Sequence, residues 1–316
     1  MIPRTAHFIW FGTSFPWVHI LAMRSAALRG GFDRVVLHHS DDLESTHWWG
    51  DAAAIPGFAA RRVDAPALFR AAGVDSEALL ETYQGLEKPE ARSNMLRVAI
   101  LAAEGGVYLD MDTVTVASFE DLLDDAGAFF GLERIVFPGK VRRSRRPDVW
   151  AGALGRAGFR EACRRRRNGW RMFRRLETRY PLAANNAVLG GEAGHPFLLD
   201  LLRRMSALPA ERRTVRFALG THLLQEAADA CTDPRVRALP PETFFPVGPE
   251  VSEHWFREDS TARAADLVLP GTRVVHWYAS VRTRSIVPHL TPDYVRTHTS
   301  TQAFSALASE VLSLTP

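Results

Sequence analysis

Residues 92–116 constrain the fold most, because they combine a helical pattern, a pair of glycines and a short apolar strand that ends in two aspartates. Glycine readily adopts the left-handed conformation that ends a helix, so Gly105–Gly106 predicts a helix end and 107–109 a buried strand. Asp110 and Asp112 follow directly, and such an i, i+2 pair points to one side where the chain is extended. Two facing carboxylates repel each other unless a cation lies between them, and oxygen ligands of this kind favour Mg²⁺, Mn²⁺ or Ca²⁺.

The helix before this strand is predicted to carry a polar edge. Ser93, Asn94 and Arg97 are spaced i, i+1 and i+4, so they can present one edge while apolar residues between them pack behind it. The helix and the strand together bring a guanidinium and two carboxylates to one rim. Such a rim suits a diphosphate group held by a metal ion and an arginine.

Strand and helix patterns alternate along the chain. We expect strands at 4–10, 34–39, 107–109 and 128–133, a short apolar strand at 273–275, and helices at 17–30, 88–104, 158–179, 196–207 and 221–230. This alternation predicts an α/β fold with a mostly parallel sheet flanked by helices on both faces. Ligands of such sheets bind beyond the carboxyl ends of the strands, where Trp10 and Asp110 both fall.

The motif and its flanks resemble the DXD-motif glycosyltransferases of the GT-A fold. The likeness is to the sugar-binding-region family that holds Golgi mannosyltransferases, bacterial capsular sugar transferases and, distantly, the glucosylating domains of large clostridial toxins. In that family a helix reading roughly Ser-Asp-x-x-Arg leads to Gly-Gly-x-Tyr-x-Asp-x-Asp. The residues in register here are Ser93, Arg97, Gly105, Gly106, Tyr108, Asp110 and Asp112.

The resemblance implies a donor-binding set made of Trp10, Ser93, Asn94, Arg97, Tyr108 and Asp110. Asn94 replaces the family's usual aspartate, which touches hydroxyls of the donor's sugar or ribose. An asparagine still accepts a hydrogen bond but carries no charge, so we expect donor affinity or sugar choice to differ.

Three other segments extend the resemblance. Residues 2–12 resemble the family's first strand, Ile-Pro-Lys-x-Ile-His-x-Ile-Trp-x-Gly, which implies that Trp10 stacks on the nucleobase. Asn186 begins a stretch like Asn-x-x-x-Gly, followed by Gly-His-Pro-Phe, whose asparagine approaches the sugar or acceptor. His276 stands where relatives often have His-His-Trp-x-x-Ser-Trp, although this chain is one residue shorter there. The resemblance thus implies that His276 is a third metal ligand; the alternative is a structural histidine. For Trp10, the alternative is a side chain that fills the core.

Composition limits the classes of protein to which this chain can belong. Its 316 residues are 46% hydrophobic, which is ample for one large core, and the net charge of +3 gives no footprint for nucleic acid. No apolar run is long enough to cross a membrane, and the chain begins with strand-like sequence. Two cysteines suit a reducing compartment, so we expect a cytoplasmic protein. Arginine greatly outnumbers lysine and alanine is abundant, as expected of a G+C-rich bacterial gene.

We expect one GT-A-like domain, 1–316, in three parts. Residues 1–136 form the nucleotide-sugar-binding half, 137–184 an Arg-rich helical insert, and 185–316 the half that closes the acceptor and metal sites. Apolar residues at helical spacing in the insert predict an amphipathic helix with a basic outer face. That face is either a solvated surface, an acceptor-side surface for a phosphorylated or acidic partner, or a region of peripheral adhesion to anionic lipid.

The resemblance implies transfer of a sugar from a nucleoside diphosphate to a hydroxyl of a glycan, lipid-linked or small-molecule acceptor, with retention of configuration. A UDP-sugar is the favoured donor and GDP-mannose the alternative, with Mn²⁺ or Mg²⁺ as cofactor. Asp110, Asp112 and His276 would bind the metal, and Asp110, Asp112, Arg97 and Asn186 would form the catalytic set. The developing charge on the diphosphate is what the cation and Arg97 would stabilise.

Two other functions also fit parts of the sequence. A protein that binds a nucleotide sugar without turning it over would fit Asn94 and the shortened His276 segment, although both aspartates are intact. A haloacid-dehalogenase-type phosphatase would fit Asp110-Met-Asp112, with the first aspartate as nucleophile. That fold also needs a later lysine and, beyond it, an acidic pair, whereas both adjacent aspartate pairs of this chain precede Lys140.

Overall fold

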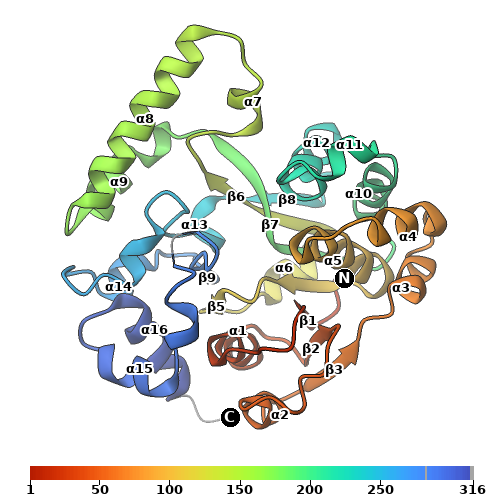
Figure 1. Cartoon of the computed structure of the whole chain (residues 1–316), viewed down its shortest axis with the longest axis horizontal. Coiled ribbons are helices and arrows are strands. Elements are labelled where there is room, and N and C mark those ends of the chain that lie inside the picture. The colour runs from red at the N-terminus through yellow and green to blue at the C-terminus, as the bar shows by residue number, and fades with distance from the viewer. Residues whose placement is uncertain (282, 314–316) are drawn as a thin grey trace.

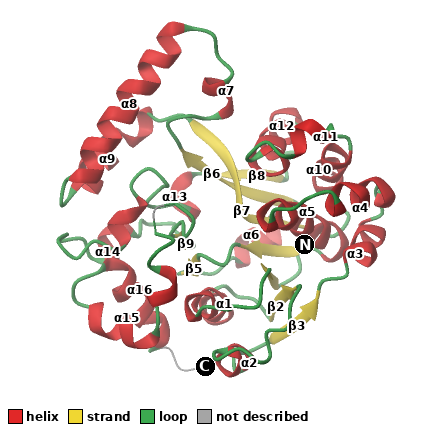
Figure 2. Cartoon of the chain, viewed as in Figure 1, coloured by secondary structure: helices red, strands yellow, loops and turns green. Residues whose placement is uncertain are grey.

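The computed structural model describes residues 1–281 and 283–313. Its centre is a seven-stranded sheet in the order β3-β2-β1-β4-β7-β6-β8 (Figures 1 and 2). These strands are β1 (Thr5–Trp10), β2 (Arg34–His39), β3 (Phe58–Arg62), β4 (Gly106–Leu109), β6 (Ala128–Arg134), β7 (Leu182–Gly191) and β8 (Val236–Leu239). Strand β7 runs antiparallel to β4 and β6, and the other neighbouring pairs are parallel. The expected α/β fold with a mostly parallel sheet is confirmed.

Helices cover both faces of the sheet. Successive residues of a strand point to opposite faces, so Phe8 of β1 lies in the core under α1 (Trp17–Arg29) and Ile9 lies in the core under α5 (Pro89–Glu104). The other α-helices of the described chain are α2 (Trp49–Ala53), α3 (Ala65–Ala72), α4 (Ser76–Gln84), α6 (Glu120–Asp125), α7 (Gly139–Arg142), α8 (Pro147–Arg165), α9 (Gly169–Leu176), α10 (Pro196–Ser206), α11 (Ala210–Arg213), α12 (Leu223–Ala230), α13 (Pro241–Phe244), α14 (Ala264–Leu267), α15 (Pro292–His298) and α16 (Ala303–Leu312). Short 3-10 turns lie at η1 (Glu177–Arg179), η3 (Ser252–Trp255) and η4 (Val287–His289), and a π-helical turn at η2 (Ala218–His222).

A second, two-stranded sheet lies next to the carboxyl end of β4. It pairs β5 (Thr113–Thr115) with β9 (Val274–His276) in antiparallel register, so that Thr113 faces His276. The chain thus runs from β4 through a short turn into β5, and β9 reaches the same turn from the C-terminal part of the sequence. This small sheet positions the candidate site.

Two histidines pair inside the main sheet, away from that site. His7 Nδ1 lies 3.0 Å from His38 Nε2, and His7 Nε2 donates to the Gly105 carbonyl at 3.0 Å. Burial lowers the pKa of His7 to about 4 and that of His38 to about 3, so both rings are neutral at pH 7.

The Arg-rich insert is helical, as expected, but the single helix predicted at 158–179 is divided between two helices, α8 and α9. Helix α8 begins at Pro147, earlier than predicted, and the chain breaks after Arg165 before α9 starts at Gly169. A Cβ atom at position 169 would lie 1.6 Å from the Cys163 carbonyl oxygen, so only glycine permits the tight turn between the helices. Figure 1 shows α7 and α8 projecting from the body of the molecule. Among the described residues, no helix combines the length and the apolar character needed to span a bilayer.

Candidate active site

The two aspartates lie in the turn between β4 and β5. The Asp110 N–H donates to the Ala187 carbonyl on β7 at 2.8 Å, and the Trp277 N–H after β9 donates to the Asp112 carbonyl at 3.0 Å. Residues 111 and 112 are in a turn conformation, so strand alternation does not explain why the two carboxylates meet. The turn and the neighbouring strands bring them together instead.

His276 completes a three-residue cluster with the aspartates. Its Nε2 atom lies 3.0 Å from Asp112 Oδ1 and 3.9 Å from Asp110 Oδ2. One potential ligand atom from each residue lies within 4.8 Å of the others. The predicted third ligand is therefore beside the predicted pair, because β9 pairs with β5.

The three groups influence one another's protonation strongly. Burial raises the pKa of Asp110 and the charge of Asp112 adds to this, although Arg97 and His276 oppose it. Burial also acts to raise the pKa of Asp112, but His276 and the Ala279 N–H, which donates to Asp112 Oδ2 at 2.7 Å, bring it below its ordinary value. The pKa of His276 is raised because its acidic neighbours outweigh its burial. Two carboxylates are thus held close together in a half-buried place that favours a positive charge.

Arg97 reaches the cluster from α5. It is 5% exposed, and its Nη1 lies 3.3 Å from Asp110 Oδ1 and donates to the Asn186 carbonyl at 2.5 Å. Its Nη2 donates to Ser93 Oγ at 3.2 Å. The guanidinium lies 4.3 Å from the centre of the Tyr108 ring, and the Tyr108 hydroxyl donates to Asp110 Oδ1 at 2.7 Å. Arg97 and Tyr108 therefore contact Asp110 directly, and Ser93 contacts Arg97.

Asn94 and Asn186 form a direct pair. The Asn186 Nδ2 donates to Asn94 Oδ1 at 2.8 Å, joining α5 to β7. The β6–β7 register shifts between Phe130 and Gly131, where the partner on β7 jumps from Leu189 to Asn185. Asn186 lies on the extra residues of this bulge, and bulges of this kind redirect side chains near active sites.

Trp10 ends β1 at the same edge of the sheet. Its Nε1 donates to the Ser14 carbonyl at 3.0 Å, and its ring centre lies 4.5 Å from that of His19. His19 Nδ1 in turn donates to the Met111 carbonyl between the two aspartates at 2.9 Å. The partly exposed indole is thus joined to the aspartate turn through one buried histidine.

Comparison with protein families assigns part of the site-bearing segment. Residues 33–128 match the model of the glycosyltransferase sugar-binding region containing the DXD motif. This segment of the chain therefore carries the sugar-binding region of the DXD-motif glycosyltransferases. The matched segment contains Ser93, Asn94, Arg97 and both aspartates, whereas Asn186 and His276 lie outside it.

Several solved structures similar to this chain are named as glycosyltransferases. PaToxG glycosyltransferase is 14% identical with a TM-score of 0.45, and the match covers 98% of this chain and 87% of that one. The UDP-bound glycosyltransferase domain from the YGT toxin is 12% identical with a TM-score of 0.41, over 99% of each chain. Mouse xyloside xylosyltransferase 1 is 13% identical with a TM-score of 0.47, over 87% of this chain and 98% of that one. No curated protein sequence matches the chain.

Two residues that the sequence did not single out lie beside the cluster of Asp110, Asp112 and His276. Glu133 on β6 is 8% exposed and accepts a hydrogen bond from the Tyr278 hydroxyl at 3.0 Å. Burial raises the pKa of Glu133 to about 7, against the effects of Asn185 and Tyr278. The Tyr278 ring lies edge-on to His276, with 4.1 Å between centres. An acid in the otherwise apolar run of β6 was the available signal.

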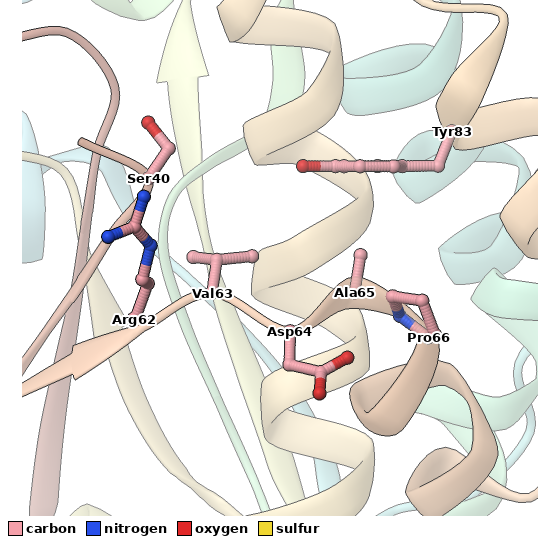
Figure 3. A pocket seen from close by; sticks show the side chains of 7 residues that line it. All are labelled: Ser40, Arg62, Val63, Asp64, Ala65, Pro66 and Tyr83. Carbon is pink, nitrogen blue, oxygen red and sulfur yellow. The ribbon is translucent and has the colours of Figure 1, made fainter.

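A hollow of about 560 Å³ lies beyond the carboxyl ends of β2 and β3 (Figure 3). It is lined by Ser40, Arg62, Val63, Asp64, Ala65, Pro66 and Tyr83. His39 is the register partner of both Trp10 and Arg62, so this hollow shares the edge of the sheet with the candidate site. None of the three candidate metal ligands lines it, so this hollow is not where we place the chemistry.

Proposed function

We propose that this chain is a metal-dependent glycosyltransferase that takes its sugar from a nucleoside diphosphate sugar, with a UDP-sugar favoured over GDP-mannose. The observation that supports this most is the cluster of Asp110, Asp112 and His276, whose ligand atoms lie within 4.8 Å of one another. The acceptor group is a hydroxyl, and the family resemblance favours retention of configuration.

The residues fit a divalent cation by their chemistry. Two carboxylates and one imidazole are ligands that Mn²⁺ accepts, and carboxylates together with phosphate oxygens suit Mg²⁺. The raised pKa of Asp110 shows that burial and Asp112 make its negative charge costly, so a cation between them would relieve the repulsion. When bound, it would neutralise charge that builds on the diphosphate as the sugar leaves.

The chain's own residues divide the remaining tasks. Arg97 and Tyr108 keep Asp110 oriented, and the near-complete burial of both means that they act by positioning. Trp10 offers a flat apolar surface for the nucleobase at the end of β1. Asn94 and Asn186 each keep further hydrogen-bonding capacity after pairing with each other, which suits sugar hydroxyls.

The direct test is nucleotide release from donor sugars. The protein is incubated with a panel of UDP- and GDP-sugars and Mn²⁺, and free UDP or GDP is measured, with and without a chelator. We expect release that depends on metal and falls roughly 10²–10³-fold in Asp112→Asn, the usual effect of removing one such electrostatic partner. The matched control is Asp125→Asn, which changes an exposed aspartate on α6 and should leave release unchanged.

Three results would contradict the proposal. Release that is unaffected by both the chelator and Asp112→Asn would remove the metal from the reaction. Donor binding without release, under every acceptor tried, would indicate a nucleotide-sugar-binding protein. Phosphate release from sugar phosphates without any nucleotide would indicate a phosphatase.

A further inference from the structure

Charge is distributed very unevenly along this chain. Residues 137–184 contain 15 basic and three acidic residues, a net charge of +12, so the other 268 residues carry a net charge of −9. The same segment forms α7, α8 and α9, which Figure 1 shows at the outer end of the molecule. The insert therefore carries a positive charge and the remaining residues together carry a negative charge.

The arginines near the junction of α8 and α9 have structural partners. Arg160 Nη1 lies 2.9 Å from Glu250 Oε2, and Arg164 pairs with Glu253. Arg174 donates to the carbonyls of Asp266 at 2.7 Å and Leu267 at 3.0 Å. These side chains hold the insert against the C-terminal part of the chain, so their charge is used within the protein.

The arginines at the outer end of the insert differ. Arg142, Arg143 and Arg145 are exposed, and none of the ion pairs among residues 1–281 and 283–313 includes them. Arg146 pairs with Asp148, its neighbour at the start of α8, in the open. Arg142 donates to the Phe137 carbonyl at 2.9 Å, but in the part of the chain that the structure describes none of these three guanidinium groups has a carboxylate partner.

Large apolar side chains are exposed beside these arginines. Trp150 is 37% exposed and Leu154, one helical turn further along α8, is 61% exposed. The Trp150 indole N–H already donates to the Ser144 carbonyl at 2.9 Å, so the ring is held in place with its polar atom satisfied. In a nearby loop, Val215 and Phe217 are 53% and 46% exposed. Most of the large exposed apolar side chains of the described residues lie in these two segments.

The two segments lie on one side of the molecule. Lys140 Nζ of α7 lies 3.5 Å from Asp229 Oδ2 of α12. Burial lowers the pKa of His222, and the charges of Arg143, Arg142 and Arg212 lower it further against that of Glu226, so basic residues of both segments act on this histidine. We call residues 140–154 together with 212–217 the basic rim.

One end of the basic rim, at residue 217, is close in sequence to a residue that packs against the candidate active site. Phe217 has a φ of 70°, an uncommon conformation for an aromatic residue, and it immediately precedes the π-helical turn η2. Within that turn Gly220 packs so tightly that a Cβ atom would lie 2.9 Å from Asn94 Nδ2 and 3.1 Å from Asn186 Nδ2. The exposed, strained Phe217 thus lies three residues before Gly220, which packs against the Asn94–Asn186 pair.

We propose that the basic rim docks on an anionic lipid surface and brings a lipid-embedded acceptor to the site. Charge alone would also suit a soluble polyanion. Exposed Trp150, Leu154 and Phe217 favour a bilayer, because aromatic and aliphatic side chains beside arginines are the composition that enters the headgroup region. The statement about the acceptor rests on the proposed function, whereas docking does not.

Sedimentation with lipid vesicles tests the docking. The whole protein is mixed with vesicles of phosphatidylcholine alone or of phosphatidylcholine with phosphatidylglycerol, and the bound fraction is measured at low and high salt. We expect binding to the anionic vesicles only. The double variant Arg142→Glu/Arg143→Glu should lower the partition constant roughly 25-fold or more, because each arginine near such a surface contributes roughly fivefold.

A second double variant tests the apolar contribution. Trp150→Ala/Leu154→Ala keeps every charge and should lower the partition constant roughly tenfold, since two partly inserted side chains are lost. The matched control is Arg34→Glu/Arg70→Glu, which makes the same change of charge at exposed positions outside the basic rim and should bind as the unaltered protein does. Thermal unfolding of each variant confirms that it is folded.

The outcomes separate docking from catalysis. Absence of binding to anionic vesicles, or equal loss in the control, would overturn the proposal. Binding that ignores Trp150→Ala/Leu154→Ala but is displaced by soluble polyglutamate would indicate an acidic partner in solution and also overturn it. UDP release without an acceptor should be unchanged in all three variants. A failure of the donor reaction can therefore be distinguished from a failure to bind vesicles.

Discussion

Replacing Arg97 with methionine tests how this site keeps its first aspartate charged and oriented. Arg97 is almost completely buried and lies 3.3 Å from Asp110, whose side chain is 27% exposed. The same guanidinium also donates to the Asn186 carbonyl and to Ser93. Methionine has a similar length and keeps the contact with Tyr108, so the substitution removes the charge and the donors but leaves most of the volume.

The expected loss follows from the unpaired carboxylate. Breaking a buried ion pair from one side typically costs about 3–5 kcal/mol, and the partial exposure of Asp110 favours the lower end, about 3 kcal/mol. At about 2 °C per kcal/mol for a chain of this size, the melting temperature should fall by roughly 6 °C. Nucleotide release should fall by roughly 10²-fold or more, since Asp110 loses the group that orients it.

The assay is a double-mutant cycle with urea unfolding and nucleotide release measured on the same four proteins. They are the unaltered chain, Arg97→Met, Asp110→Asn and Arg97→Met/Asp110→Asn. Removing both partners leaves no uncompensated charge, so the double variant should lie within about 1 kcal/mol of the unaltered protein. Its nucleotide release should stay as low as that of either single variant.

In this cycle the double variant should therefore regain stability without regaining nucleotide release. The reasoning is refuted if Arg97→Met unfolds with a free energy close to that of the unaltered protein, or if adding Asp110→Asn restores no stability. Either result would mean that the 3.3 Å contact does not hold Asp110. Recovery of activity in the double variant would equally remove Asp110 from the reaction.

Other predictions concern neighbouring groups. Because the folded-state pKa of Glu133 is raised to about 7, its contribution to stability is present below its unfolded pKa and is lost as pH rises through 7. Glu133→Gln should therefore reduce the dependence of the free energy of unfolding on pH, measured by urea unfolding. An unchanged pH dependence would contradict this. The pKa values of His7 and His38 are lowered to about 4 and about 3, so their contribution is present above about pH 6.5 and is lost as pH falls toward 4; His38→Gln should reduce that acid loss. Gly220→Ala should push the Asn94–Asn186 pair apart and slow transfer more than it lowers the melting temperature, whereas unchanged kinetics would show that the pair tolerates the shift. Asn94→Asp keeps the acceptor for Asn186 but adds charge, so donor competition assays should show an altered sugar preference at similar stability.

Much of the site was predictable because its signals are local. The helix with Ser93 and Arg97, the glycine stop and the strand before Asp110 are neighbours in sequence, and the structure has β4 and α5 within one or two residues of the predicted bounds. Strands β1 and β2 were predicted equally well, since their apolar runs are bounded by polar or glycine residues. The roles of these residues in donor and metal binding stay predictions.

Other features were wrong or missed because they depend on distant partners. The insert was predicted as one helix, but the contact between Gly169 and Cys163 divides it. Strand β7 was not predicted as a strand, and its bulge, which presents Asn186, depends on pairing with both β4 and β6. Glu133 becomes notable only because Tyr278, far along the chain, lies against it in a buried place.

The sequence by itself determined the chemistry that is available: two aspartates after a buried strand, an arginine one helix earlier, and a segment with a large excess of basic charge. These follow from side-chain identity and from periods of two and 3.6 residues, which need no knowledge of the remaining chain. Only the tertiary structure decided that His276 lies beside Asp112, that Arg97 contacts Asp110, and that Arg142, Arg143 and Arg145 have no carboxylate partner among the described residues. The physical reason is that strand pairing and burial between distant segments set these distances, and with them the pKa values and the unneutralised charge.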